Sequence, residues 1–292
     1  MNKEDEKVLQ PKIASREVTM HILKAFGLRM SKKLGQNFLI DARIVQGIVD
    51  AAEVKPGDRV LEIGPGIGTL TQGLAEAGAD VTAVELDKKL PAVLKETLKA
   101  YDNVRIVPGD ILKVNIPEIM GEAPFKVAAN LPYYITSPIL MRLLEEKLPI
   151  RNITVMVQKE AAQRLCAAPG TRDAGAISYA VAYYAEPKLL FSVQPGSFYP
   201  APKVTSAVIR LDVREKPAVT VPNGDESAFF ALIRAAFSQR RKTAANAIAN
   251  GLHLPKAQVI SALQAAGLDE RSRPEQLTLE NYCALQTALA NT

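Results

Sequence analysis

Between residues 59 and 157, short apolar stretches alternate with longer stretches whose apolar positions recur at helical spacing. The short stretches predict strands at Arg59–Ile63, Asp80–Glu85, Val104–Pro108, Phe125–Ala129 and Ile153–Val157. Helices are predicted between them at Leu70–Ala77, Lys88–Ala100 and Pro138–Glu146, and before them at Ser15–Phe26 and Asp41–Ala52. Strands that alternate with helices are typical of a parallel, doubly wound sheet covered on both faces, so we expect an α/β fold.

The pattern changes twice after residue 157. Three apolar stretches follow with little helix between them, at Ala180–Tyr184, Lys188–Val193 and Ala207–Val213, and they predict an antiparallel hairpin at the end of the sheet. The segment Pro217–Asn223 is rich in turn formers and reads as a linker. Beyond it the pattern is helical only, with helices predicted at Phe229–Phe237, Ala244–Ala249, Lys256–Ala266 and Leu279–Leu289. The change predicts a sheet-containing domain over 1–210 and a small all-helical domain over 211–292.

Basic residues are in modest excess. The chain has 36 Lys and Arg against 31 Asp and Glu, a formal net charge of +5 and a pI of about 9.1. Two runs concentrate this charge, Lys32-Lys33 and Arg240-Arg241-Lys242. The excess favours an anionic partner such as nucleic acid, although a basic run alone is equally compatible with a solvated surface.

Several classes of chemistry are disfavoured by composition. The two cysteines, Cys166 and Cys283, and the two histidines, His21 and His253, are all isolated in the sequence. We therefore expect no metal site, no disulfide framework and no His-based nucleophilic triad. The sequence has no run near the ~18 apolar residues that a membrane span needs, and its charged N-terminus lacks the apolar core of a signal peptide, so we expect a cytoplasmic protein.

A glycine-rich turn follows the first strand of the alternating region. Its spacing is Gly64-x-Gly66-x-Gly68, which differs from the G-x-G-x-x-G expected for a dinucleotide. This closer spacing suits a nucleoside ligand without phosphate, such as S-adenosylmethionine. Glu85 ends the next strand, 21 positions after Gly64, where a carboxylate can accept both ribose hydroxyls. A tight turn without a ligand and a surface ion pair are the alternatives for these two features.

The third strand ends at Asp110 and Ile111. Asp110 is placed to accept a proton from an adenine amine, and Ile111 to cover the ring, although Asp110 taken alone is equally suited to capping a turn. Ligand-facing residues at three consecutive strand ends match the rule that sites lie beyond the carboxyl ends of parallel strands.

The fourth strand ends in Asn130-Leu-Pro-Tyr133, the most informative tetrapeptide in the chain. The adenine amine is a poor nucleophile because its lone pair is delocalised into the ring. The side-chain carbonyl of Asn130 and the backbone carbonyl of Leu131 can grip its N–H groups and favour a pyramidal nitrogen. Pro132 stiffens the turn that aims these acceptors, and Tyr133 offers a ring on which a base can stack. A Pro-containing loop with a half-buried Tyr is the alternative.

With these residues the chain resembles the ribosomal RNA adenine dimethyltransferases. Asn130–Tyr133 resembles the catalytic motif of amino-group adenine methyltransferases. The stretches Lys33–Leu39 and Ser197–Ser206 resemble the N-terminal cofactor motif and the F-x-P-x-P-x-V-x-S segment of the family. The segments Phe237–Thr243 and Arg273–Leu277 resemble the helical domain of the small-subunit members, the KsgA/RsmA group.

The resemblance implies a Rossmann-like class I methyltransferase fold with S-adenosylmethionine as cofactor. The cofactor contacts that it implies are Asn37, Leu39, Gly64, Glu85, Asp110 and Asn130. It implies that Phe198 sandwiches the target base against Tyr133 after the base leaves its stack. It also implies that Arg240–Lys242 grip phosphates, and that the target is two adjacent adenosines in a hairpin loop near the 3′ end of small-subunit ribosomal RNA.

The same resemblance implies a monomeric protein that acts within an assembling 30S particle and takes part in ribosome biogenesis. A large-subunit adenine methyltransferase of the macrolide-resistance type shares the cofactor and catalytic motifs, but Phe237–Thr243 and Arg273–Leu277 argue against it. A non-catalytic RNA-binding assembly factor is opposed by the intact Asn130–Tyr133. The glycine spacing and the same tetrapeptide oppose a nicotinamide oxidoreductase.

Overall fold

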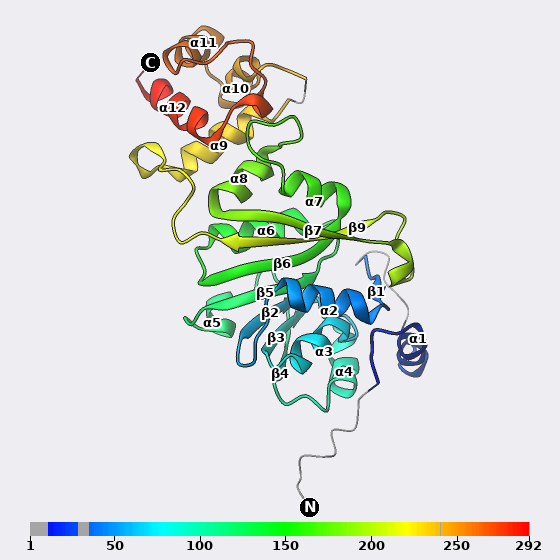
Figure 1. Ribbon diagram of the computed structural model, residues 1–292. Coiled ribbons are helices and arrows are strands. Elements are labelled where there is room, and N and C mark those ends of the chain that lie inside the picture. The colour runs from blue at the N-terminus through cyan, green and yellow to red at the C-terminus, as the bar shows by residue number, and fades with distance from the viewer. Residues whose placement is uncertain (1–10, 29–34, 240, 292) are drawn as a thin grey trace, which may run out of the picture. The chain divides into compact units, whose positions relative to one another are not determined.

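The computed structural model of the protein describes residues 11–28, 35–239 and 241–291 (Figure 1). The chain divides into two compact units. The first comprises Met1–Ala162 and Lys188–Asp212, and the second comprises Gln163–Pro187 and Val213–Thr292. The first unit carries the sheet and the second is helical.

The first unit is built on a seven-stranded sheet in the order β4-β3-β2-β5-β6-β9-β7. The strands are β2 (Arg59–Ile63), β3 (Asp80–Glu85), β4 (Val104–Pro108), β5 (Phe125–Asn130), β6 (Ile150–Gln158), β7 (Ala185–Val193) and β9 (Ser206–Val213). The first five pair in parallel, whereas β9 runs antiparallel to β6, with Val155 opposite Ile209. The predicted α/β fold with an antiparallel end is therefore confirmed.

Seven helices lie before residue 166 in the described part of the chain. They are α1 (Arg16–Ala25), α2 (Ala42–Ala51), α3 (Thr69–Glu76), α4 (Leu90–Thr97), α5 (Ile116–Met120), α6 (Thr136–Glu145) and α7 (Lys159–Leu165), and a short 3₁₀ turn, η2 (Pro195–Ser197), comes later. In Figure 1, α2, α3 and α4 lie on the face of the sheet turned toward the viewer. Apolar side chains of α2 and α3, such as Ile48 and Leu74, are buried with Val60 and Val81 of the strands in one core cluster. Burial of this apolar surface holds the helices on the sheet.

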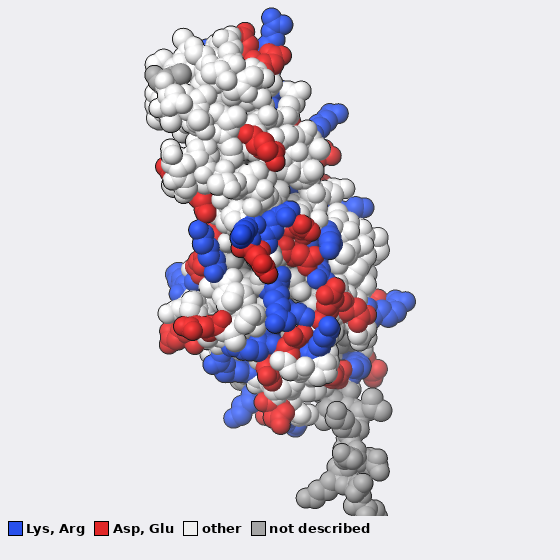
Figure 2. All heavy atoms as spheres, turned by 60° about the vertical axis from the view of Figure 1, so that its left-hand side comes forward, with Lys and Arg blue, Asp and Glu red and all other residues white. Residues whose placement is uncertain are grey.

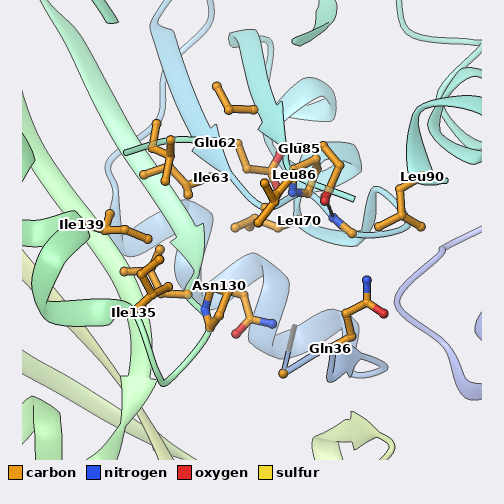
Figure 3. A pocket seen from close by; sticks show the side chains of 18 of the residues that line it. Gln36, Glu62, Ile63, Leu70, Glu85, Leu86, Leu90, Asn130, Ile135 and Ile139 are labelled. Atoms are coloured by element: carbon orange, nitrogen blue, oxygen red, sulfur yellow. Dashed lines mark hydrogen bonds between the residues drawn. The ribbon is translucent and has the colours of Figure 1, made fainter. Parts of the chain in front are cut away.

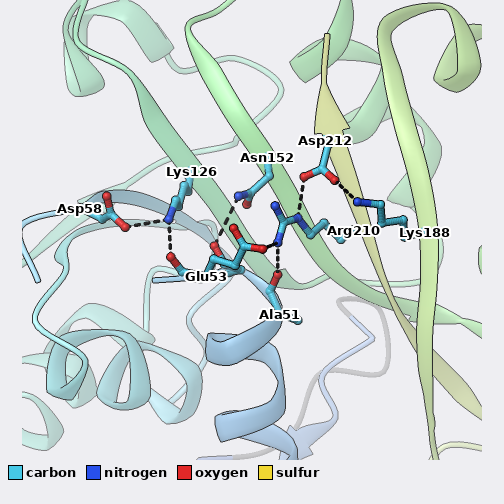
Figure 4. A network of polar contacts seen from close by, with 9 residues as sticks. Ala51, Glu53, Asp58, Lys126, Asn152, Lys188, Arg210 and Asp212 are labelled. Carbon is cyan, nitrogen blue, oxygen red and sulfur yellow. Dashed lines mark hydrogen bonds and ion pairs between the residues drawn. The ribbon is translucent and has the colours of Figure 1, made fainter. Parts of the chain in front are cut away.

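The C-terminal end of α2 is held by polar side chains from three strands (Figure 4), and we call these side chains, Lys126, Asn152 and Arg210, the polar clamp on α2. Arg210 of β9 donates to the carbonyl of Ala51 at 3.0 Å, and Asn152 of β6 donates to the carbonyl of Ala52 at 3.3 Å. Lys126 of β5 donates to the carbonyl of Glu53. The last turn of α2 has no basic residue of its own, so these groups satisfy its terminal carbonyls and complement its dipole.

The second unit consists of helices packed around aromatic side chains. Its helices are α8 (Ala176–Tyr184), α9 (Glu226–Ala236), α10 (Ala244–Leu252), α11 (Lys256–Ala265) and α12 (Leu279–Ala290), with 3₁₀ turns η3 (Pro222–Gly224) and η4 (Pro274–Gln276). The ring of Tyr179 lies 5.3 Å from the rings of both Phe237 and Tyr282. Edge-to-face and tilted aromatic contacts of this kind stabilise the core of the unit.

Two expectations from the sequence are corrected here. Ala180–Tyr184 was expected to be a strand, but it forms the end of α8, in which most side chains, including Tyr179 and Tyr183, are buried. A short apolar run with no polar face shows neither the 3.6-residue period of a helix nor the two-residue period of a strand. Its pattern therefore cannot distinguish a buried helix from a buried strand. Because the rings of α8 pack with the C-terminal helices, 163–187 belongs to the helical unit, and the units do not divide simply at residue 210.

Candidate active site

A pocket lies at the carboxyl ends of the central strands (Figure 3). Parallel pairing sets Ile63 beside Val84 and Glu85 beside Pro108, so the residues that follow these strands meet at one edge of the sheet. Of the residues expected at a site from the sequence, those that line this pocket are Asn37, Leu39, Gly64, Gly66, Glu85, Asp110, Ile111 and Asn130–Tyr133. The structure thus brings together segments that are up to about ninety residues apart in the chain.

The glycine turn after β2 forms one wall of the pocket. Gly64, Gly66 and Gly68 have φ angles of 69°, 60° and 94°, which residues other than glycine rarely adopt. A Cβ added to Gly66 would lie 3.2 Å from the ring of Phe38, and one added to Gly68 would lie 3.1 Å from Leu98. A Cβ at Gly64 would meet nothing within 4 Å. Gly64 therefore leaves free space on the pocket side, whereas the other two allow close packing.

Glu85, at the end of β3, is bound to the glycine turn. Its Oε2 accepts the N–H of Gly66 at 3.1 Å, and its Oε1 accepts the N–H of Asp87 at 2.7 Å. Only 6% of the residue is exposed, and this burial raises the pKa of its carboxyl, although the two backbone N–H groups oppose the rise. The carboxylate is consequently fixed in orientation at the pocket wall, with lone pairs left to accept further hydrogen bonds.

Glu62 is a second buried acid in the pocket, and it was not among the site residues predicted from the sequence. It is 1% exposed within β2, and its complete burial raises the pKa of its carboxyl to about 8. Among the described residues its Oε2 finds no hydrogen-bond partner. The signal in the sequence was a charged residue inside an otherwise apolar strand, which is costly unless a partner or ligand compensates for it.

Asp110 and Ile111 lie beyond the end of β4, as expected. The Oδ1 of Asp110 accepts the N–H of Leu112 at 3.0 Å, so this side chain also caps the turn in which it lies. Ile111 is 7% exposed and forms an apolar part of the pocket wall. A polar acceptor beside an apolar surface suits the edge and the face of a purine.

The Asn130–Tyr133 segment continues β5 and is held by several hydrogen bonds. The Nδ2 of Asn130 donates to the carbonyl of Asn37 at 3.3 Å, which leaves Oδ1 as the amide atom able to accept. The N–H of Leu131 donates to the carbonyl of Met156 on β6 at 3.1 Å. The hydroxyl of Tyr133 lies 2.7 Å from Oγ of the buried Ser206, at the start of β9. The segment is thereby anchored to two strands and to the N-terminal motif.

A small separate sheet connects the N-terminal motif to the segment after β7. It consists of β1 (Phe38–Leu39) and β8 (Phe198–Tyr199), with Leu39 opposite Phe198. Phe198 is only 3% exposed and packs in the core cluster with Leu39. Phe198 is not among the residues that line the pocket, and its stacking on a base opposite Tyr133 stays a prediction. Pairing with β1 places Phe198 in the core, and strands of two residues leave no period in the sequence from which this pairing could be predicted.

Comparison with known proteins identifies the family. Residues 27–291 match the family described as ribosomal RNA adenine dimethylase. The chain belongs to the ribosomal RNA adenine dimethylase family. Curated relatives named ribosomal RNA small subunit methyltransferase A include one from Alkaliphilus oremlandii, 48% identical over 96% of this chain and 98% of the relative. Another, from Lachnoclostridium phytofermentans, is 49% identical over 91% of this chain and 94% of its own length.

Two solved structures extend the comparison. A dimethyladenosine transferase from Plasmodium falciparum is 27% identical, with a TM-score of 0.70, covering 85% of this chain and 95% of that one. The 23S rRNA methyltransferase ErmE is also 27% identical, with a TM-score of 0.66, covering 87% of this chain and all of the other. A dimethyladenosine transferase and a 23S rRNA methyltransferase therefore share this fold.

In this dimethylase the basic groups expected to bind RNA lie in the helical unit. Arg240 lies outside the described residues, while Arg241 and Lys242 are exposed in the turn before α10. A second cavity within this unit is lined by three arginines, Arg164, Arg172 and Arg273, together with Asp173, Gln239 and Glu275. The face of the sheet-containing unit seen in Figure 2 instead carries basic and acidic side chains side by side. The same unit contains ion pairs such as Lys188–Asp212, at 2.8 Å.

Two kinds of site are not found in the described residues of this dimethylase. In that part of the chain no group of three or more His, Cys, Asp or Glu residues is arranged to hold a metal ion. Over the same residues no helix is both long and apolar enough to cross a membrane.

Proposed function

We propose that this protein transfers methyl groups from S-adenosylmethionine to the exocyclic amines of two adjacent adenosines, giving N6,N6-dimethyladenosine. The target is a hairpin loop near the 3′ end of small-subunit ribosomal RNA. The observation that carries the proposal is one pocket in which Asn130 and Tyr133 face the same space as Gly64 and Glu85. An amine-gripping segment and a nucleoside site are thus adjacent, as methyl transfer requires.

The choice of small-subunit RNA is supported by the relatives named for that subunit, which are 46–49% identical over nearly the whole chain. The alternative is methylation of large-subunit RNA, as the name of ErmE states for that protein. Its identity of 27% is considerably lower. The proposal includes action as a monomer on an assembling 30S particle, as the resemblance to the small-subunit members of the family implies.

The residues of the pocket fit S-adenosylmethionine. The free space beside Gly64 admits a ligand against the backbone, and the buried Glu85 carboxylate can accept ribose hydroxyls. Glu62, whose Oε2 has no partner among the described residues, suits the cationic amino group of the ligand. Asp110 and Ile111 would contact the adenine, and Asn37, Leu39 and Asn130 would close the other side. The bound cofactor supplies an electrophilic methyl group.

The protein contributes to the chemistry by positioning the adenine amine beside the methyl group and by forming hydrogen bonds to that amine. The Oδ1 of Asn130 and the carbonyl of Leu131 would accept hydrogen bonds from the N–H groups of the adenine amine, which favours the pyramidal nitrogen that attacks the methyl carbon. Tyr133, which lines the pocket and is held through its hydroxyl, would stack on the base. No group in Asn130–Tyr133 is a suitable base, so the amine proton leaves to water as the N–C bond forms and the bond from carbon to sulfur breaks.

Binding of RNA is assigned to the helical unit. Arg240, Arg241 and Lys242 would grip phosphates, and the neighbouring cavity with Arg164, Arg172 and Arg273 offers further guanidinium groups. Guanidinium groups bind phosphate through paired hydrogen bonds, which fixes the orientation of the backbone. RNA of this kind is recognised largely by shape and backbone, so these groups need not read sequence.

The proposed function is tested by incubating the protein with labelled S-adenosylmethionine and unmethylated small or, separately, large ribosomal subunits, followed by mapping of the modified bases. We expect label in two adjacent adenosines, each as N6,N6-dimethyladenosine. Asn130→Ala should lower the rate of methyl transfer by about 10²–10³-fold while RNA affinity changes little. Label found only in large subunits, or only monomethyladenosine with excess cofactor, would contradict the proposal.

A further inference from the structure

Tyr134 is an exposed aromatic residue at the mouth of the candidate active site. Its exposed fraction is 58%, the highest among the exposed large apolar residues in the described part of the chain, and its side chain still lines the pocket. An aromatic ring that is exposed to water beside a ligand site costs free energy in the free protein, and a partner that covers the ring removes this cost. Such rings are typical of surfaces that a partner covers.

The ring is held in place rather than left at the end of a loose loop. The turn that carries it is closed by the carbonyl of Pro132, which accepts the N–H of Ile135 and the hydroxyl of Thr136, both at 3.2 Å. A Cβ built on Gly35 would lie 3.7 Å from Cδ1 and 3.8 Å from Cε1 of Tyr134. One edge of the ring therefore packs along the backbone at Gly35, and the rest is open to solvent.

The two consecutive tyrosines have different surroundings. Tyr133 is partly buried, and its hydroxyl bonds to Ser206, so that ring belongs to the pocket wall. Tyr134 follows it in the turn and is more than half exposed. A nucleotide chain whose adenine enters the pocket beside Tyr133 must continue past the rim, where Tyr134 is.

We propose that Tyr134 is a stacking surface for the nucleobase next to the adenine that occupies the pocket. This inference rests on the proposed function, in which the substrate contains two adjacent adenosines. When one base leaves its stack it exposes a face of its neighbour, and an aromatic ring at the rim can cover that face. Tyr134 would thereby hold the second adenosine close to the pocket that it must enter next.

The experiment compares Tyr134→Ala and Tyr134→Phe with the wild-type protein. Dissociation constants are measured for unmethylated small ribosomal subunits and, separately, for S-adenosylmethionine, and methyl transfer is followed at each of the two adenosines. Tyr134→Ala should weaken subunit binding by about 5- to 100-fold, the range that loss of one stacked base gives. Tyr134→Phe keeps the ring and should bind subunits like the wild type. Affinity for S-adenosylmethionine should not change in either variant.

Phe26→Ala is the matched control. Phe26 is another exposed aromatic residue, 40% accessible, and it does not line the pocket, so its removal should leave subunit binding unchanged. Subunit binding by Tyr134→Ala equal to that of the wild type would overturn the inference. Weaker binding of S-adenosylmethionine with unchanged subunit binding would also overturn the inference. In that case Tyr134 would act by packing on the segment at Gly35 and not by stacking on RNA. Failure of the proposed function is distinguishable, because the wild-type protein itself would then leave the adenosines unmethylated.

Discussion

The hydroxyl of Tyr133 and the hydroxyl of Ser206 lie 2.7 Å apart, although the two residues are 73 positions apart in the chain. Ser206 is fully buried at the start of β9, and burial raises the pKa of the Tyr133 hydroxyl. This bond joins the Asn130–Tyr133 segment to the last residue of the Ser197–Ser206 segment. Two motifs that are separate in the sequence are therefore joined where Tyr133 lines the pocket.

Tyr133→Phe should retain most methyl-transfer activity and lose some stability. The ring remains to stack on the base, while the lost hydrogen bond should lower the free energy of unfolding by about 1 kcal/mol. Tyr133→Ala removes the ring and should weaken RNA binding by roughly 5- to 100-fold. Denaturant unfolding and subunit methylation measure the two effects. If Tyr133→Phe were as inactive as Tyr133→Ala, the hydroxyl would have a direct part in the reaction.

Glu62 should make the stability of the cofactor-free protein depend on pH. Its pKa is about 8 in the folded protein and about 4.5 in the unfolded chain, so the unfolded chain ionises first as pH rises. The free energy of unfolding should therefore fall between pH 5 and pH 8, by roughly 3 kcal/mol from this group. In Glu62→Gln the fall should be much smaller, and the variant should be more stable than the wild type at pH 8.

Denaturant unfolding at pH 5, 6.5 and 8 measures this dependence. Asp80→Asn is a suitable control, because Asp80 is an exposed acid at the start of β3 and its change should leave the slope with pH unaltered. Parallel curves for wild type and Glu62→Gln would show that Glu62 is already ionised in the folded protein, and the explanation from burial would be wrong.

The polar clamp on α2 should contribute more stability through Lys126 than surface ion pairs do. The Lys126 side chain is 8% exposed and bonds to the carboxylate of Asp58 at 2.7 Å as well as to the carbonyl of Glu53. Lys126→Met would leave both acceptors without this donor, so the free energy of unfolding should fall by about 2–3 kcal/mol. Lys188→Met removes an ammonium that is 56% exposed and should cost about 0.5 kcal/mol. Equal losses in chemical denaturation would contradict the distinction.

The sequence predicts most of the pocket because its residues follow strands. The rule for parallel sheets placed Gly64, Glu85, Asp110 and Asn130 at one edge from local pattern alone. Phe198 was different, because its position depends on pairing with Leu39, a contact between two-residue strands that leave no period in the sequence. The clamp on α2 was also unpredictable, since its donors lie 73, 100 and 159 residues from the carbonyls that they bind.

The helical unit shows the same limit. The helices after residue 225 have recognisable apolar periods, and each was expected close to its observed position. The membership of 163–187 in that unit depends on contacts of Tyr179 with Phe237 and Tyr282, which lie 58 and 103 positions further along the chain. Sequence reasoning locates elements by local spacing, whereas the grouping of elements into units depends on such distant contacts.

Neutralising Arg241 and Lys242 tests whether the basic run of the helical unit binds phosphate. Each cation that contacts a phosphate releases condensed counterions, so loss of two contacts should lower the slope of log affinity against log salt by roughly 1–2. Arg241→Ala with Lys242→Ala should therefore weaken subunit binding most at low salt and leave S-adenosylmethionine affinity unchanged. Lys95→Ala with Lys99→Ala, on and beside α4, removes the same charge from the other unit and should leave the slope unaltered. Filter binding at several salt concentrations measures both slopes. Identical slopes in the two double variants would mean that only net charge matters and that the run is a solvated surface.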